Sequence, residues 1–186
     1  MVTQTKLFYF GYGQNHSPEM MAAITGRNEN DLVSYESTLN GYELCIQDLN
    51  QIPNIPQAII RNSWEALAES YRSYAIRPKE GSKVKGRVYV LTERERELVK
   101  NFDFTDLGWH DEHQVKVSSA SNAGTLDVVT DVLGEGQDIS HVVDGLAYSD
   151  FLNHKETTLK GAEKAREVFL EKLIKEGMYN PTELKG

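Results

Sequence analysis

The chain has 186 residues, of which 39% are hydrophobic and 26% are charged, and its formal net charge at pH 7 is −8. This length suits a single globular domain over residues 1–186 that can bury a core, and the composition excludes a fibrous or disordered chain. The acidic balance, without a local cluster of basic residues, argues against nucleic acid and anionic membranes as partners.

The first residues of the chain and its single cysteine bear on location. No apolar run approaches the roughly 20 residues that span a bilayer, and the first ten residues lack the pattern of a signal peptide. Cys45 has no second cysteine to pair with, so it is interpreted as a small buried side chain. We therefore expect a cytoplasmic protein in a reducing compartment. Nothing in the sequence specifies an oligomeric state.

The first predicted elements are a strand and a helix. The aromatic-rich run over residues 7–12 predicts a buried strand. Ser17 is placed as the N-cap of the following helix, with Pro18 at its first position. Gly26 can end that helix in the left-handed conformation that glycine tolerates.

Two antiparallel pairs are predicted next. Residues 32–39 and 42–47 flank the dipeptide Asn40-Gly41, which is typical of a type I′ turn, so they predict a β-hairpin. Residues 72–78 and 83–91 alternate apolar and polar side chains on either side of a turn, which predicts a second pair. The segment between these pairs, residues 57–71, is open between strand and short helix.

The second half of the chain predicts one helix, three strands and a final helix. Thr92 and Glu95 have the spacing of a capping box, which starts the first helix. The charged stretch that follows, TERERE, is interpreted as a solvated helix face. The remaining predicted elements are strands over 109–119, 125–133 and 143–151, and a helix over 157–176. This order favours an α+β fold around a mixed or antiparallel sheet.

A glycine-rich turn follows the first strand, over residues 11–15. A dinucleotide-binding fingerprint would need a third glycine where this chain has His16, and the Gly-Lys-Ser/Thr of a phosphate-binding loop is absent. Two interpretations stay open for these residues: a structural strand-to-helix turn, or backbone N–H groups that bind a carboxylate or an oxyanion.

Several segments together resemble a known family. The stretches are YFGYGQN (9–15), LNGYEL (39–44), RPKEGSKVKGRVYVL (77–91), VKNFDF (99–104), HQVKV (113–117) and GAEKA (161–165). In order and spacing they are similar to motifs of the γ-glutamylcyclotransferase-like family, among them YFAYGSN and LDxYEG. The resemblance implies a small barrel-like sheet of about six strands with flanking helices. It also implies that a γ-glutamyl amide or a related small amide is cyclised to 5-oxoproline, with release of an amine.

The resemblance assigns roles to residues of this chain. Gly13, Gln14 and Asn15 would bind the glutamyl group through backbone N–H groups, and Tyr12 would shape the wall of the site. Asp103 stands where the family has the glutamate that acts as general base. Lys100 and Phe104 replace the family's aspartate and glycine around it.

Tyr148 is a further candidate, as a hydroxyl in the pocket. The substrate would be a small molecule with a γ-glutamyl-like group, and no cofactor or metal is implied. Because Asp103 is one methylene shorter than the family's glutamate, an alternative is a non-catalytic binding module that keeps the pocket without the base. Asp106 and Glu112 are other carboxylates that could take the role of the base.

Two histidine-containing segments complete the candidates. In His110-Asp111-Glu112-His113, strand alternation places the two histidines on opposite faces, so a polar edge strand is a better interpretation than a metal site. His16 follows the glycine-rich turn and is either a ligand contact or a polar residue at the start of a helix.

Overall fold

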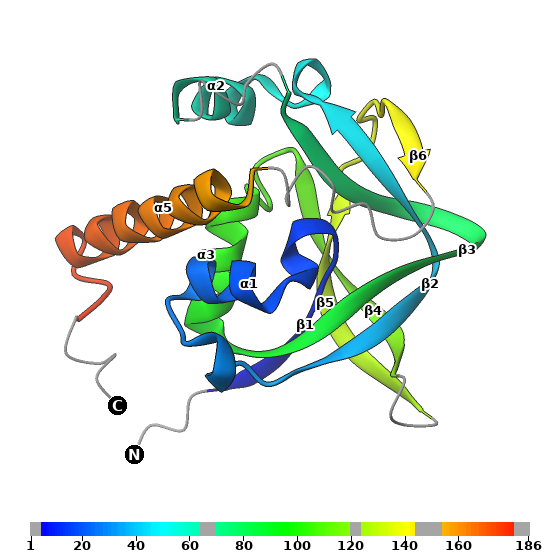
Figure 1. The fold of residues 1–186 in the computed structure, drawn as a ribbon, viewed down its shortest axis with the longest axis horizontal. Coiled ribbons are helices and arrows are strands. Elements are labelled where there is room, and N and C mark those ends of the chain that lie inside the picture. Colours follow the sequence, from blue (N-terminus) through cyan, green and yellow to red (C-terminus); the bar gives the residue numbers. More distant parts are fainter. Residues whose placement is uncertain (1–4, 64–69, 120–123, 144–153, 181–186) are drawn as a thin grey trace.

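The computed structural model describes residues 5–63, 70–119, 124–143 and 154–180, which form a strand-built body with helices along one side (Figure 1). The strands are β1 (Lys6–Gly11), β2 (Ser34–Asp48), β3 (Arg72–Thr92), β4 (His110–Ser119), β5 (Thr125–Leu133) and β6 (His141–Val143). The helices are α1 (Pro18–Thr25), α2 (Asn54–Ser63), α3 (Glu93–Asp103) and α5 (Lys155–Lys175), and a short 3-10 turn spans Gly13–His16.

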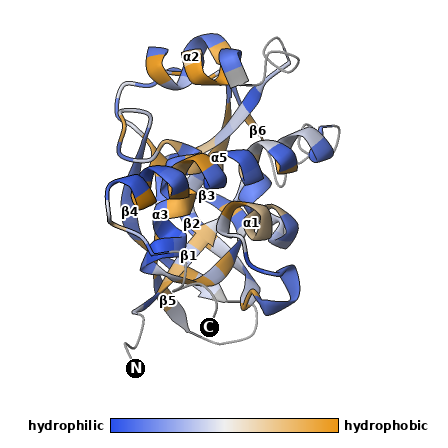
Figure 2. Cartoon of the chain, turned by 90° about the vertical axis from the view of Figure 1, so that its left-hand side faces the viewer, coloured by the Kyte–Doolittle hydropathy of each residue, from blue (hydrophilic) through white to orange (hydrophobic). Residues whose placement is uncertain are grey.

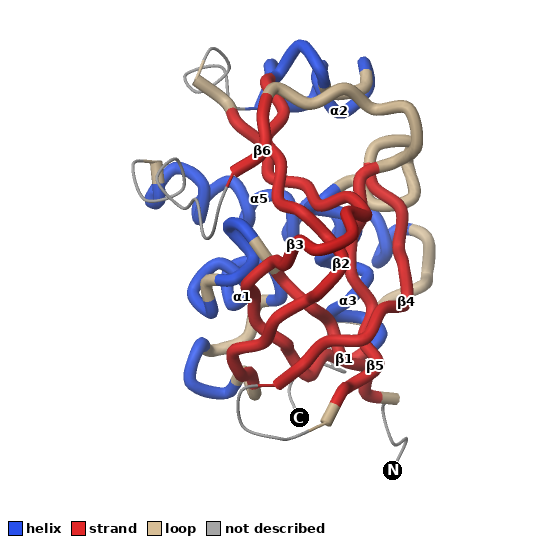
Figure 3. The backbone as a smooth tube through the Cα atoms, turned by 90° about the vertical axis from the view of Figure 1, so that its right-hand side faces the viewer, coloured by secondary structure: helices blue, strands red, loops and turns tan. Residues whose placement is uncertain are grey.

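The sheet closes into a barrel. Its strand order is β3-β1-β5-β4-β2-β6, and β2 also pairs with β3, so five strands form a closed ring and β6 extends it from β2. The β1–β5 pair is parallel and the other pairs are antiparallel, which makes the barrel mixed. In Figure 3 the strands cross one another in front, and the helices lie behind and around them, with α2 at the top. The predicted α+β barrel-like fold with about six strands is confirmed.

The two predicted hairpins are wrong. Residues 34–48 form one strand, β2, and β3 pairs with it from Ser34↔Tyr89 to Asp48↔Arg72. The register shifts between Asn40 and Tyr42, and Gly41 has a φ of +80° at that point. The glycine therefore permits an irregularity that bends a continuous strand, where a turn would have reversed the chain. Both halves of the second predicted pair lie in β3 and face β2.

The helix ends agree with the sequence. Ser17 Oγ accepts a hydrogen bond from the Met20 amide, and Gly26 ends α1 with a φ of +78°. Thr92 and Glu95 form the reciprocal hydrogen bonds of a capping box at the start of α3, so this prediction is confirmed. The ambiguous segment overlaps the second half of α2, and α5 covers most of the last predicted helix. Coloured by hydropathy, α2 and α5 carry both hydrophilic and hydrophobic residues (Figure 2), and among the hydrophobic ones Ile60 of α2 and Leu173 of α5 are buried.

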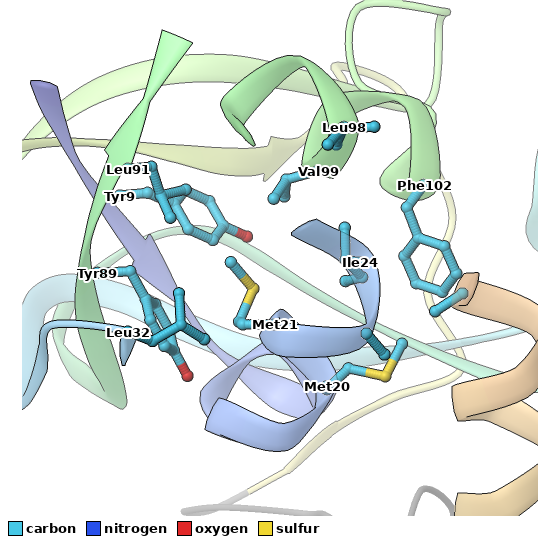
Figure 4. Packing of buried hydrophobic residues seen from close by; sticks show 12 residues of the cluster. Tyr9, Met20, Met21, Ile24, Leu32, Tyr89, Leu91, Leu98, Val99 and Phe102 are labelled. Atoms are coloured by element: carbon cyan, nitrogen blue, oxygen red, sulfur yellow. The ribbon is translucent and has the colours of Figure 1, made fainter. Parts of the chain in front are cut away.

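The largest apolar cluster joins the helices to the barrel. Met20, Met21 and Ile24 of α1 lie at its centre (Figure 4). Around them pack Tyr9 of β1 and two residues of β3, Tyr89 and Leu91. The helix α3 contributes Leu98, Val99 and Phe102. Ala162 of α5 is buried in the same cluster. This packing fixes the C-terminal end of α3 against the barrel, and the candidate base Asp103 is the last residue of that helix. No helix in the described part of the chain is both long enough and apolar enough to span a membrane.

Candidate functional site

A cavity of about 50 Å³ lies where the glycine-rich turn, the start of β3 and the end of α3 meet. It is lined by Tyr9, Tyr12, Gln14, Asn15, Tyr71, Arg72, Ser73, Tyr74, Phe102, Asp103, Phe104, Trp109, His110 and Asp131. All of these side chains are aromatic or polar, and the set combines two carboxylates with one guanidinium. The cavity is therefore lined by aromatic rings and is rich in charge.

The structure brings most of the predicted site residues together. Tyr12, Gln14, Asn15 and Asp103 line this one cavity, although 88 positions separate Asn15 from Asp103. Gly13 lies between them in the turn. Tyr148 is outside the described residues, so its role stays a prediction.

Asp103 is held by the side chain of Asn15. Asn15 Nδ2 donates to Asp103 Oδ2 at 2.7 Å and contacts the Tyr9 hydroxyl at 3.1 Å. The Asn15 backbone N–H donates to the Tyr12 carbonyl at 3.0 Å, so Asn15 reaches the site through its side chain. The sequence interpretation had expected its backbone amide there. In this turn, the amides of Gly13 and Gln14 are the remaining donors of the three that were predicted.

The environment raises the pKa of Asp103 to about 8. Desolvation by burial is the largest cause, and the negative charge of Asp131 adds to it. The guanidinium of Arg96 and the hydrogen bond from Asn15 oppose the shift. A carboxyl group with a pKa near the working pH can both accept and return a proton, which is what a general acid–base catalyst needs.

A buried ion pair between Arg96 and Asp131 adjoins the cavity, and it was not predicted from the sequence. Arg96 of α3 donates to both carboxylate oxygens of Asp131 on β5, at 3.1 and 2.6 Å. Thr105 Oγ1 donates to Asp131 Oδ1 at 3.0 Å, and the Tyr12 hydroxyl donates to the Asp131 carbonyl at 2.6 Å. The interpretation of TERERE as a solvated face is therefore wrong for Arg96, which is only 3% exposed.

A signal for Arg96 was present in the sequence. Arg96, Val99 and Asp103 are spaced i, i+3 and i+7, which places all three on one face of α3. A charged residue that shares a helix face with a buried valine is a candidate for a buried ion pair. Its partner, Asp131, could not be identified in this way because it lies 35 positions away on another strand.

His110 is a further residue of the site whose role was not predicted from the sequence. Its side chain is 4% exposed, its ring stacks on Trp109, and its Nδ1 lies 3.0 Å from the Asp103 carbonyl oxygen. Burial lowers its pKa, which favours the neutral ring. Within the described residues, no group of three or more His, Cys, Asp or Glu side chains could hold a metal ion.

The other candidates lie outside the cavity lining. Asp106 bonds Lys100 at 2.8 Å, and Glu112 bonds Arg96 at 2.8 Å. His16 contacts Glu36 at 2.7 Å through Nε2. Cys45 is buried, and its thiol donates to the Ala75 carbonyl. Among the carboxylates considered as a base, Asp103 is the one that reaches this cavity.

Gly13 is expected to be indispensable to the turn. Its φ is +56°, and a Cβ atom there would lie 2.7 Å from Cβ of Tyr74. The substitution Gly13→Ala should therefore lower the free energy of unfolding by about 2–4 kcal/mol, from backbone strain and the clash together. Gly81 is a matched control, because its φ is +80° and an added Cβ meets nothing within 4 Å. Urea unfolding should give Gly81→Ala only the strain, about 1 kcal/mol. Equal losses would show that contact with Tyr74 does not constrain the turn.

Three solved structures share this fold. The structure described as a gamma-glutamyl cyclotransferase superposes with a TM-score of 0.55 and 14% identity, covering 98% of this chain and 92% of that one. An uncharacterized protein of Homo sapiens gives a TM-score of 0.55 and 14% identity, with coverage of 97% and 92%. A protein of Arabidopsis thaliana gives 0.54 and 14%, with coverage of 94% and 95%. No family model and no curated protein matches the chain. At such identities the likeness shows a common fold.

Proposed function

We propose that this protein cyclises a γ-glutamyl amide or a related small amide, releasing 5-oxoproline and an amine. The observation that carries the proposal is the meeting of Asp103 and the glycine-rich turn at one cavity, with the pKa of Asp103 raised to about 8. The fold shared with a gamma-glutamyl cyclotransferase supports it. The resemblance of the YFGYGQN and VKNFDF segments points to the same chemistry.

Asp103 is assigned as the general base. Its carboxylate would take a proton from the substrate's α-ammonium group, and the freed amine would attack the γ-carbonyl carbon. The new carbon–nitrogen bond closes a five-membered ring, and the bond from the same carbon to the leaving amine breaks. The proton held on Asp103 then passes to the leaving nitrogen. The freed carboxylate takes the second proton that the ring nitrogen loses on closing the lactam, and the released amine takes up that proton as its ammonium form. Because the attack is intramolecular, holding the substrate folded supplies much of the rate acceleration.

The turn would supply the donors that this reaction needs. The amides of Gly13 and Gln14 would stabilise negative charge on the substrate's carboxylate or on the oxyanion of the tetrahedral intermediate. Arg72 lines the same cavity and carries a guanidinium group, while its Nε also pairs with Asp48 at 2.9 Å. A cation at the cavity favours a ligand that carries a carboxylate. The ring of Tyr12 would form a wall of the site.

The alternative is a binding module without catalysis. It is motivated by the shorter side chain of Asp103, since a misplacement of about 1 Å can cost on the order of a hundredfold in rate. The raised pKa and the orientation of Asp103 toward the cavity, through its bond to Asn15, favour the enzyme. A carboxylate that pointed to solvent would favour the binding module.

Release of 5-oxoproline from a panel of γ-glutamyl amides and dipeptides tests the proposal directly. Turnover of at least one compound by the purified protein would support the enzyme. Binding of the same compounds without any release, together with release by an Asp103→Glu variant, would establish the binding module instead. Neither binding nor release across the panel would overturn the assignment to γ-glutamyl compounds.

A further inference from the structure

His110 has one nitrogen with a hydrogen-bond partner and one without. Its Nδ1 lies 3.0 Å from the Asp103 carbonyl oxygen, which can only accept, so Nδ1 carries the ring proton. Burial favours the neutral ring, and in a neutral ring with its proton on Nδ1 the Nε2 atom is a bare acceptor. Nε2 is buried and has no hydrogen-bond partner among the described residues.

Asn15 leaves a second acceptor unpaired. Its Nδ2 is used by Asp103 and the Tyr9 hydroxyl, which fixes the orientation of the amide. Its Oδ1 is buried and has no partner within the part of the chain that the structure describes. A buried acceptor without a donor is unfavourable, so two of them beside one cavity indicate a ligand that supplies hydrogen-bond donors.

The cavity therefore combines three acceptors. Asp103, Asn15 and His110 all line it, and they offer a carboxylate, an amide oxygen and an imidazole nitrogen. A primary ammonium group has three N–H donors around one nitrogen, one for each of these acceptors. Its positive charge complements the carboxylate of Asp103. A carbonyl or carboxylate group, which has no donor, would leave His110 Nε2 and Asn15 Oδ1 unpaired.

We propose that His110 Nε2, together with Asn15 Oδ1 and Asp103, binds the amino group of the substrate, and that His110 sets a requirement for a primary amine. This inference rests on the proposed function and names the part of the substrate that the site recognises. Once Asp103 has taken one proton, the hydrogen bonds to His110 and Asn15 hold the remaining two hydrogens. The lone pair of the nitrogen is then free to face the γ-carbonyl carbon.

Paired ligands and paired variants test the role of His110. γ-L-Glutamyl-L-alanine and glutaryl-L-alanine differ only in the α-amino group, and an Asp103→Asn background blocks turnover so that both dissociation constants can be measured by calorimetry. An asparagine at position 110 can keep the bond to the Asp103 carbonyl but loses the acceptor at Nε2. A glutamine places its amide near the position of Nε2.

We expect the background variant to prefer the amino compound by about tenfold or more, and His110→Asn to reduce that preference about fivefold to tenfold. His110→Gln should restore part of the preference. His113→Asn, an exposed histidine on the same strand, should leave it unchanged. In the ligand-free protein, the ¹⁵N chemical shifts of His110 should show protonated Nδ1 and bare Nε2.

The contrary results separate this inference from the proposed function. Protonated Nε2 in the free protein, or an amino preference that His110→Asn does not change, would overturn the role of His110 while 5-oxoproline release by the wild type still stood. If neither compound bound and the wild type released no 5-oxoproline, the proposed function would fail, and this inference with it.

Discussion

Asp103→Asn is expected to lower the rate of 5-oxoproline release by at least about a hundredfold, because a positioned general base contributes roughly 10²–10⁴ in rate. The amide can still accept the hydrogen bond from Asn15 Nδ2, so the cavity should keep its shape. Asp106→Asn is the matched control. Asp106 lies three residues further on, is exposed and is absent from the cavity lining, so its variant should retain full activity.

The pH dependence of the wild type should report the same group. A base must be deprotonated, so kcat/KM should rise about tenfold per pH unit on the acidic side and level off above the pKa of about 8. Asp103→Asn should remove this limb from whatever activity remains. An acidic limb centred near pH 4 would mean that the carboxylate is solvated and that burial does not tune it.

Stability gives a second measurement that does not depend on turnover. The pKa of Asp103 is about 8 in the folded protein and about 3.9 in an unfolded chain. Between these values the folded state binds more protons than the unfolded state, so the free energy of unfolding should fall as the pH rises from about 4 to about 8. Asparagine does not titrate. Asp103→Asn should therefore be more stable than the wild type at pH 9, by about 1–4 kcal/mol, and should gain little near pH 4.

The features that sequence predicted well are those decided locally. The caps of α1 and α3 depend on residues within one helical turn, and Ser17, Thr92 and Glu95 form the hydrogen bonds that their spacing predicts. The prediction of a hairpin at Asn40-Gly41 is wrong, although its local signal was strong. A turn preference is small beside the continuous pairing of β2 with β3, and a glycine at φ +80° serves a bulge as well as a turn.

The residues of the candidate site also fall into those that local sequence reveals and those that it does not. Tyr12, Gln14, Asn15 and Asp103 could be chosen because they belong to two short motifs, and the barrel brings those motifs to one cavity. Asp131 and His110 could not, since what distinguishes them is burial, and their burial depends on strands that are remote in sequence. For Arg96 the spacing along the helix was a signal, but its partner was not identifiable. An arginine in a charged helix stretch is normally solvated. At position 96 the partner on β5 reverses that expectation.

Arg96→Met is expected to have the largest effect on stability, a loss of about 3–5 kcal/mol, because it leaves a buried carboxylate without its counter-charge. Arg96 and Asp131 are each about 3% exposed. Burial would lower the pKa of Arg96, but the attraction of Asp131 outweighs it and raises that pKa. Without Arg96, the described contacts of the Asp131 carboxylate are the hydroxyls of Thr105 and Tyr9.

Arg94→Met on the same helix is the matched control. Arg94 bonds Glu97 at 2.6 Å on the surface, so its replacement should cost about 1 kcal/mol or less in urea unfolding. The double variant Arg96→Met/Asp131→Leu should be more stable than Arg96→Met alone, since it removes the uncompensated charge as well. A double variant no more stable than the single one would mean that the pair stabilises through packing rather than charge.

The loss in Arg96→Met should also depend on pH, with a sign that identifies its cause. An unpaired, buried Asp131 would have its pKa raised above the unfolded value of about 3.9, so folding would take up a proton and the variant would lose stability as the pH rises. The deficit relative to wild type should then be smaller at pH 5 than at pH 8. Arg96 also lowers the pKa of Asp103, so its removal should move the acidic limb of activity to higher pH. A deficit that is equal at both pH values, with an unmoved limb, would show that Arg96 acts on neither carboxylate through its charge.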